Sequence, residues 1–426
     1  MLSGLAEGVH LWSSASSQLH CQQELTIMKM SDRISGFQCS PIRRLVPYSR
    51  DAKARGVHVY HLNIGQPDIK TPEQVITAVS KYNEPIIAYG NSEGMTELRE
   101  ALPKYYRTFG IEVSPEDILI TTGGSEALQF TFMTLCDPGD EIIIPEPYYT
   151  NVDSFARMAM VKLVPITSKM EDGFALPDID HFEEKITDRT KGVLLCSPNN
   201  PTGHIYTPEE LVQILEMCKR HDIFLIVDEV YREFCYDGKD FTSVLSYPEY
   251  ADRVVCVDSF SKRYSMCGAR VGAMISRNPE VLESALKLSQ ARLCPPDIEQ
   301  YAACAALLTP ASYLAEVKAE YERRRDFFVK GLQSIEGVRC VSPKGAFYLV
   351  AELPVDDAEK FAIFMLRDFD LDKETVMFAP AEDFYVTKGI GKRQARFAYV
   401  LNTTDLEHAV ECLRAGLKAY QAVMEK

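Results

Sequence analysis

Residues 254–272 read VVCVDSFSKRYSMCGARVG, and this stretch decides how the rest of the chain is interpreted. Its first residues, Val254–Val257, form a short apolar run that predicts a buried strand. Lys262 follows among serines, and Arg270 stands eight residues further on. A deprotonated lysine amine condenses with an aldehyde, while serine hydroxyls, backbone N–H groups and an arginine bind a phosphate dianion. The stretch therefore predicts a site for a small molecule that carries both an aldehyde and a phosphate.

Pyridoxal 5′-phosphate is such a molecule. The stretch resembles the cofactor-lysine motif of the class I/II aminotransferases, the aspartate aminotransferase family. The resemblance implies that Lys262 holds this cofactor covalently and that Ser259, Ser261 and Arg270 bind its phosphate. Taken alone, the stretch also fits a purely structural alternative, a buried strand that runs into a basic turn.

The composition excludes several classes of protein. With 426 residues, 46% of them hydrophobic and 25% charged, the chain predicts a globular protein of two domains. Its net charge of −15 disfavours nucleic-acid binding. The 12 cysteines are scattered singly and the 8 histidines form no HExxH pattern, so we predict free thiols in a reducing cytoplasm and no metal site. No apolar run reaches membrane-spanning length, so no membrane partner is expected.

Residues 1–29 lack a basic start followed by an apolar core, so a secretory signal is not predicted. They are expected to be a disordered N-terminal extension. Met28 or Met30 is an alternative natural start, and a short docking arm is a further alternative.

The middle of the chain alternates apolar runs with helical patterns. The runs are Ile118–Thr121, Glu141–Ile144, Lys162–Ile166, Gly192–Cys196, Ile223–Val227, Val254–Val257 and Val271–Ile275. Helices are predicted over 125–136 and over 207–220, the latter with Thr207 as its cap and Glu210 three residues on. Continuous apolar strands separated by helices predict an α/β fold with a mostly parallel sheet covered on both faces.

After about residue 310 a long charged helix, 311–335, gives way to strand-like segments at 346–351, 376–379 and 396–401. These predict a smaller α+β domain. The resemblance implies the fold-type I architecture, with a large cofactor-binding domain over 78–308. The small domain then comes from both chain ends, 30–77 and 309–426.

Ligands of open α/β sheets bind at the carboxyl ends of strands, and polar residues recur there. Gly124 and Ser125 follow the run 118–121 and open a helix whose free N–H groups suit a phosphate. A plain strand–turn–helix corner is the alternative. Asn200 lies in PNNPTG, residues 198–203, which is either a simple turn or the family's signature. The resemblance assigns Gly124 and Ser125 to the cofactor phosphate, and Asn200 to the cofactor's phenolic oxygen and the substrate carboxylate.

Asp228 ends the most apolar run. A carboxylate there is costly unless it is paired, and a pyridinium N–H would pair it. The resemblance assigns Asp228 to the ring nitrogen, whose protonation makes the ring an electron sink, and Tyr231 to the phenolic oxygen. The structural alternatives are a helix cap or surface ion pair for Asp228 and simple packing for Tyr231.

Other site residues are also assigned by resemblance. Tyr149 would stack on the pyridine ring, with core packing as the alternative. Tyr89, followed by Gly94, Leu98 and Arg99, matches a pattern whose tyrosine reaches the phosphate in the neighbouring subunit, which implies a homodimer.

Two residues are assigned to the substrate. Gly65, within LNIGQPD at 62–68, would bring a backbone N–H to the substrate carboxylate. Arg396 would clamp the α-carboxylate, with a solvated strand-end arginine as the alternative. The stretch KGAFY, 344–348, is a weaker match that is also explained by structure alone.

The resemblance implies a pyridoxal-phosphate-dependent aminotransferase. It would move an amino group from an L-amino acid, aspartate or a broad range, to a 2-oxo acid such as 2-oxoglutarate by a ping-pong mechanism. A dicarboxylate specialist needs a second cation; Ser125 stands where some relatives have lysine, and Arg292 is a candidate. A carbon–sulfur lyase of the same fold stays open. A non-catalytic cofactor-binding sensor is disfavoured, since residues 1–60 hold no helix-turn-helix pattern or strong basic run.

Overall fold

The computed structural model describes residues 30–37 and 40–425. The chain divides into two compact units, one ending at Phe37 and the other running from Gln38 to Lys426. In the first unit, helix α1 (Asp32–Ser35) is capped by the Ser31 side chain, which accepts a hydrogen bond from the Ile34 N–H at 3.4 Å. The extension predicted over 1–29 lies outside the described residues.

All seven apolar runs are strands of one sheet, with the order β2-β8-β7-β6-β5-β3-β4. The strands are β2 (Ile118–Thr121), β3 (Glu141–Glu146), β4 (Lys162–Thr167), β5 (Thr190–Cys196), β6 (Phe224–Asp228), β7 (Val254–Ser259) and β8 (Gly272–Ile275). Neighbours pair in parallel except where β8 pairs antiparallel with β2 and β7. The prediction of a mostly parallel sheet is confirmed.

The sheet is buried on both faces, which explains why its strands are continuous apolar runs. In β6, Leu225 and Val227 pack into one apolar core and Ile226 into another. In β7, Val255 and Val257 join Ile226. Since successive side chains of a strand point to opposite faces, a strand covered on both sides has no polar positions to alternate with.

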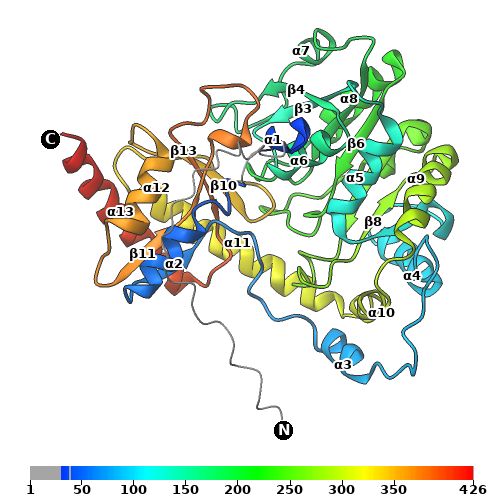
Figure 1. The fold of residues 1–426 in the computed structure, drawn as a ribbon, viewed down its shortest axis with the longest axis horizontal. Helices are drawn as coiled ribbons and strands as arrows, with labels where there is room; N and C mark the ends of the chain where they lie inside the picture. Colours follow the sequence, from blue (N-terminus) through cyan, green and yellow to red (C-terminus); the bar gives the residue numbers. More distant parts are fainter. Residues whose placement is uncertain (1–29, 38–39, 426) are drawn as a thin grey trace, which may run out of the picture. The chain divides into compact units, whose positions relative to one another are not determined.

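Helices supply the other half of each core. On one face lie α5 (Gly123–Leu135), α6 (Asn151–Met158) and α9 (Pro279–Arg292), and on the other α4 (Thr96–Arg107), α8 (Pro208–His221) and α10 (Asp297–Ala306). Figure 1 shows strands of this sheet among these helices. The predicted capping of α8 is confirmed. Thr207 Oγ1 accepts the Glu210 N–H at 3.2 Å, and Glu210 Oε2 accepts the Thr207 N–H at 2.7 Å.

A second region combines both ends of the second unit. Its strands are β1 (His58–His61), β9 (Arg339–Cys340), β10 (Tyr348–Glu352), β11 (Glu374–Met377), β12 (Ala379–Pro380) and β13 (Gln394–Ala398). β12, β13, β10 and β9 form an antiparallel sheet, and β1 pairs in parallel with β11. Segments far apart in the sequence therefore share this region. The predicted strand over 396–401 is shifted to 394–398, because pairing with β10 ends at Ala398.

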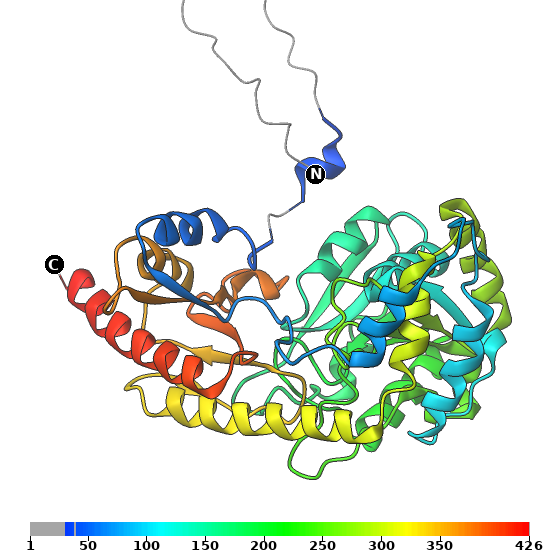
Figure 2. The same cartoon turned by 90° about the horizontal axis from the view of Figure 1, so that it is seen from below.

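Four helices of the described residues pack on these strands. They are α2 (Val46–Ala54), α11 (Ala311–Gln333), α12 (Ala358–Arg367) and α13 (Thr403–Met424). Figures 1 and 2 show α11, in yellow, beside α13, in red. The remaining elements are α3 (Glu73–Lys81), α7 (Ile179–Glu183) and the 3₁₀ turns Pro115–Asp117, Val244–Ser246, Pro248–Arg253 and Glu382–Phe384. Among the described residues, none of the helices has the length and apolar character needed to cross a membrane.

Candidate active site

A cavity of about 500 Å³ opens where the carboxyl ends of β5, β6 and β7 meet residues from both chain ends. It gathers every predicted site residue except Tyr89. The predicted residues that line it are Gly65, Gly124, Ser125, Tyr149, Asn200, Asp228, Tyr231, Ser259, Ser261, Lys262, Arg270 and Arg396. Residues more than 300 positions apart in the sequence thus share one cavity.

The Lys262 amine lies inside this cavity, just beyond the end of β7. Its Nζ donates a hydrogen bond to the Gly65 carbonyl oxygen at 2.8 Å, and Cys267 Sγ lies 3.7 Å away. No carboxylate forms an ion pair with Lys262 within residues 40–425 that the structure describes, so the amine is held by neutral acceptors. A primary amine held this way is placed to meet a carbonyl ligand that enters the cavity.

One end of the cavity is a cluster of hydrogen-bond donors. Arg270 Nη1 lies 3.4 Å from Ser261 Oγ, and Ser259 Oγ lies 2.9 Å from Ser261 Oγ. Helix α5 begins here at Gly123, which has φ of +73°, and a Cβ at that position would lie 2.4 Å from Arg270 Nη2. The glycine therefore lets the guanidinium approach the helix N-terminus. These donors, with no acid paired to Arg270 in the described part of the chain, fit a phosphate dianion.

Asp228 is the one acid among the described residues that line the cavity. It is half-buried at the end of β6, and its Oδ1 accepts the Val230 N–H at 3.1 Å. Burial, together with the nearby Asp258 and Glu229, raises the pKa of Asp228 to about 7. A carboxylate in this position is stabilised by a cationic N–H donor, and a pyridinium nitrogen is such a donor.

Arg396 lies at the other end of the cavity and is only 1% exposed. Its Nη1 donates to Asn200 Oδ1 at 3.3 Å, and its Nη2 donates to the Asn63 carbonyl oxygen. The Nε is buried without a hydrogen-bond partner, and no acid pairs with this guanidinium among the described residues. Burial lowers the pKa of Arg396. A buried arginine that lacks an acid fits a carboxylate ligand.

Tyr348 joins the cavity wall, although the sequence assigned it no role. Its hydroxyl lies 2.9 Å from that of Tyr231, and the Arg396 guanidinium lies 4.7 Å from its ring centroid. A Cβ on Gly65 would fall 1.7 Å from the Tyr348 hydroxyl, so only glycine fits beside it. The KGAFY stretch was the available signal, but the sequence could not separate a wall residue from a packed one. The structure also places Arg43, outside every motif, on the same wall.

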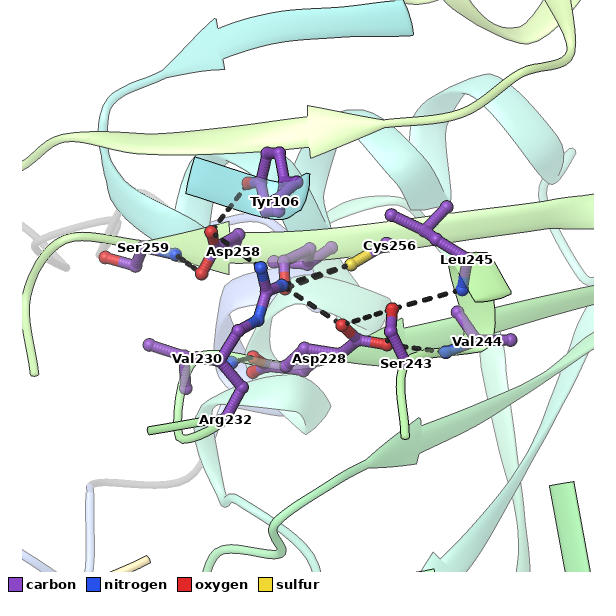
Figure 3. A network of polar contacts seen from close by, with 12 residues as sticks. Tyr106, Asp228, Val230, Arg232, Ser243, Val244, Leu245, Cys256, Asp258 and Ser259 are labelled. Atoms are coloured by element: carbon purple, nitrogen blue, oxygen red, sulfur yellow. Dashed lines mark hydrogen bonds and ion pairs between the residues drawn. The ribbon is translucent and has the colours of Figure 1, made fainter. Parts of the chain in front are cut away.

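A buried ionic network lies directly behind the site (Figure 3). Arg232 Nη2 donates to Glu229 Oε2 at 3.0 Å, and its Nη1 lies 3.6 Å from Asp258 Oδ2. Arg263 Nη1 and the Tyr106 hydroxyl donate to Asp258 at 2.8 and 2.6 Å. Burial opposes ionisation of Asp258, but the two arginines hold its pKa below the usual value.

This network fixes the ends of two neighbouring strands. Glu229 follows Asp228 at the end of β6, and Asp258 precedes Ser259 at the end of β7. Asp258 Oδ1 also accepts the Ser259 N–H at 2.7 Å. Two buried acids paired with two buried arginines thus hold the backbone beside Asp228 and Ser259.

Three other candidates have different surroundings. Tyr149 is half-buried on the cavity wall. Tyr89 is 82% exposed and does not line the cavity. Arg292 is also absent from the wall: its Nη1 pairs with Glu126, and its Nη2 donates to the Ser92 carbonyl oxygen at 3.0 Å.

Known proteins resemble nearly the whole chain. Residues 57–413 match the model of the family "Aminotransferase class I and II". A probable aspartate/prephenate aminotransferase of Aquifex aeolicus is 32% identical, covering 92% of this chain and 99% of its own. An aspartate aminotransferase of Bacillus subtilis is 31% identical, covering 91% and 98%.

Solved structures agree. The aspartate aminotransferase of Thermotoga maritima superposes with a TM-score of 0.83 at 30% identity, covering 91% of this chain and 100% of that one. The alanine aminotransferase of Pyrococcus furiosus does so with a TM-score of 0.83 at 32% identity, covering 92% and 100%.

The cavity fits pyridoxal phosphate on the evidence of its own side chains. It has a primary amine at Lys262, an anion cradle around Arg270, an acid with a raised pKa at Asp228 and an acid-free buried arginine at Arg396. The chain belongs to the class I and II aminotransferases, fold-type I enzymes that use pyridoxal phosphate to transfer amino groups.

Proposed function

We propose that the chain moves the amino group of an L-amino acid, aspartate or a broader range, to a 2-oxo acid such as 2-oxoglutarate by a ping-pong mechanism. The observation that carries this proposal is the arrangement of Lys262, Asp228 and the acid-free Arg396 around one cavity. The names of the relatives, aspartate and aspartate/prephenate aminotransferases, support aspartate as the first donor to test.

Each chemical task then has a residue suited to it. Pyridoxal phosphate, when bound, supplies an aldehyde for the amine and a ring that withdraws the negative charge left when a proton leaves Cα. The Lys262 amine would act first as a general base that takes this proton from the substrate Cα. It would then act as a general acid that delivers the proton to a different carbon atom. Arg396, with Asn200, holds the α-carboxylate, and Gly65 adds a backbone N–H. This fixes which bond at Cα faces the lysine.

The cofactor is held at its edges by separate groups. The phosphate would be bound by the N-terminus of α5, at Gly124 and Ser125, and by Ser259, Ser261 and Arg270. Asp228 would accept a hydrogen bond from the ring nitrogen and keep it protonated. Tyr231 and Asn200 would donate to the phenolic oxygen, and Tyr149 would stack on the ring.

We also infer a homodimer, with Tyr89 reaching the neighbouring site. The support is a stretch of apolar side chains on the surface: Ile86, Ile87 and Tyr89 are 75%, 64% and 82% exposed. Exposed apolar stretches of this kind favour a protein partner. The division into a large domain over 78–308 and a small one from 30–77 and 309–426 belongs to this proposal. A cytoplasmic location is supported by cysteines that are free thiols in the described residues.

The proposal is tested with the purified protein loaded with pyridoxal phosphate. Single L-amino acids are added and the visible absorbance of the cofactor is followed; we expect conversion to the aminated form, reversed by 2-oxoglutarate. Borohydride reduction should attach the cofactor to the peptide that contains Lys262, and Lys262→Ala should abolish both results.

The other candidate functions give different results. Release of a thiol and a 2-oxo acid from cysteine-type substrates would identify a carbon–sulfur lyase and overturn the aminotransferase proposal. Bound cofactor that no amino acid converts would replace it with a sensor. Cofactor attached to a lysine other than Lys262 would overturn the site assignment.

A further inference from the structure

The cavity wall has more positive charges than are needed to bind the cofactor and one substrate carboxylate. Among the described residues, four cationic ones line it, Arg43, Lys262, Arg270 and Arg396, against the single acid Asp228. In the proposed function Lys262 carries the cofactor, Arg270 faces its phosphate and Arg396 faces the α-carboxylate. Arg43 is the cation left without a task.

Arg43 has no side-chain partner among the residues that the structure describes. It is exposed, and its guanidinium makes no ion pair or side-chain hydrogen bond within residues 30–37 and 40–425. The next residue, Arg44, is bound by Asp383 and Glu359. The two adjacent arginines thus differ: one stabilises the fold, and the other lies on the cavity wall with its donors unused by the described chain.

The backbone places Arg43 at the substrate end of the cavity. Asn63 Nδ2 donates to the Ile42 carbonyl oxygen at 2.8 Å, and the Asn63 carbonyl oxygen accepts from Arg396 Nη2. The Arg43 N–H donates to the Ser40 carbonyl oxygen at 2.9 Å, which closes the turn that carries it. One residue, Asn63, therefore links the turn of Arg43 to the arginine proposed to hold the α-carboxylate. The phosphate cradle belongs to other segments.

We propose that Arg43 binds the second carboxylate of a dicarboxylic amino acid or 2-oxo acid, so that the substrate class of this site is dicarboxylic. This inference rests on the proposed function. A guanidinium is suited to the task because it binds a carboxylate with two parallel hydrogen bonds. The alternatives considered from the sequence are weaker, since Ser125 is uncharged and Arg292 is paired with Glu126.

The test compares Arg43→Gln with the unchanged protein, both loaded with pyridoxal phosphate. The concentration that gives half of the full absorbance change is measured for aspartate, glutamate and alanine. The half-saturating concentration of a dicarboxylate divided by that of alanine gives the ratio to compare. We expect Arg43→Gln to raise this ratio by about 10- to 100-fold, the range for losing one charge-assisted hydrogen bond. Arg43→Lys should recover part of that loss.

A binding measurement removes the chemistry from the comparison. Maleate carries two carboxylates and no amine, so its dissociation constant, measured by calorimetry, reports the carboxylate sites directly. We expect Arg43→Gln to raise the dissociation constant of maleate by a similar factor. The matched control is Arg50→Gln, which removes an exposed arginine of helix α2 that does not line the cavity and should leave the ratio unchanged.

The outcomes separate the two proposals. Conversion by amino acids with a ratio that Arg43→Gln does not alter would overturn the assignment of Arg43 and leave the aminotransferase intact. Preference of the unchanged protein for alanine over aspartate and glutamate would overturn the dicarboxylic substrate class. A third outcome is that no amino acid converts the cofactor, while Arg43→Gln still weakens the binding of maleate. This outcome would overturn the proposed function alone.

Discussion

The hydroxyl oxygens of Tyr231 and Tyr348 lie 2.9 Å apart in the cavity wall, and both residues are buried. Tyr231 lies in the turn that follows β6 (Phe224–Asp228) of the large sheet, while Tyr348 begins β10 of the antiparallel sheet. Burial raises the pKa of the Tyr231 phenol, so it stays protonated and serves as a donor. This contact joins residues from the two sheets at the cavity.

We expect Tyr348→Phe to act on the cofactor through Tyr231. The ring against Arg396 is retained, but the Tyr231 hydroxyl loses its partner, at a cost of about 1 kcal/mol in the free energy of unfolding. A pH titration of the visible absorbance of the loaded protein should shift relative to the unchanged protein.

The control for this prediction is Tyr236→Phe, which removes a buried hydroxyl that donates to the Ala346 carbonyl oxygen away from the cavity wall. This control should lower the free energy of unfolding by a similar amount and leave the pH titration of the visible absorbance unchanged. An identical titration for Tyr348→Phe and Tyr236→Phe would show that Tyr348 has only a structural role.

Asp228→Asn should stabilise the cofactor-free protein and weaken cofactor binding. The carboxyl ionises near its ordinary pKa in the unfolded chain but at about 7 in the folded one. Between these values the folded state keeps a proton that the unfolded state has lost, so the unchanged protein becomes less stable as pH rises through this window. Asparagine carries no charge and avoids that loss.

Urea unfolding of cofactor-free protein at several pH values measures this effect. We expect Asp228→Asn to gain about 1 kcal/mol near pH 5 and about 3 kcal/mol at pH 8, reduced from the full shift because the cavity admits water. A gain that does not change between these pH values would contradict the raised pKa.

Glu229→Ala should destabilise the fold by about 3 to 5 kcal/mol, because it leaves Arg232 buried with only the more distant Asp258. Denaturant unfolding at neutral pH measures it. Glu112→Ala is the control: its ion pair with Arg107 is exposed, and losing it should cost less than about 1 kcal/mol. Equal losses in the two variants would mean that the network of Figure 3 is not the support we describe.

Ile87→Glu should convert the proposed dimer to a monomer. A charge within the exposed stretch around Ile86, Ile87 and Tyr89 would have to be desolvated at an interface. Sedimentation velocity gives the mass directly, and Ile76→Glu, an exposed apolar residue on α3, tests whether the effect is specific to this stretch. A mass that Ile87→Glu leaves unchanged would place the interface, if any, elsewhere.

The sequence by itself determined the large sheet and most of its site. Seven continuous apolar runs are sufficient to predict a sheet covered on both faces, because burial of both faces removes the polar alternation. Asp228 follows such a run directly, and Asn200 and Lys262 lie a few residues past the ends of two others, so strand ends place them close together. The capping of α8 is also local, since Thr207 and Glu210 bond to each other's backbone.

Only the tertiary structure decided the relations between distant segments. It brings Arg396 to Asn200 and Asn63, joins Tyr348 to Tyr231, and places Arg43 on the cavity wall while Arg44 is paired with acids. The contact of Arg396 with Asn63 and the place of Arg43 on the wall have no sequence signature, because each depends on where distant chain segments are packed. The physical reason is that periodicity and capping report neighbours along the chain, whereas a cavity wall is made by side chains whose only relation is their distance in space.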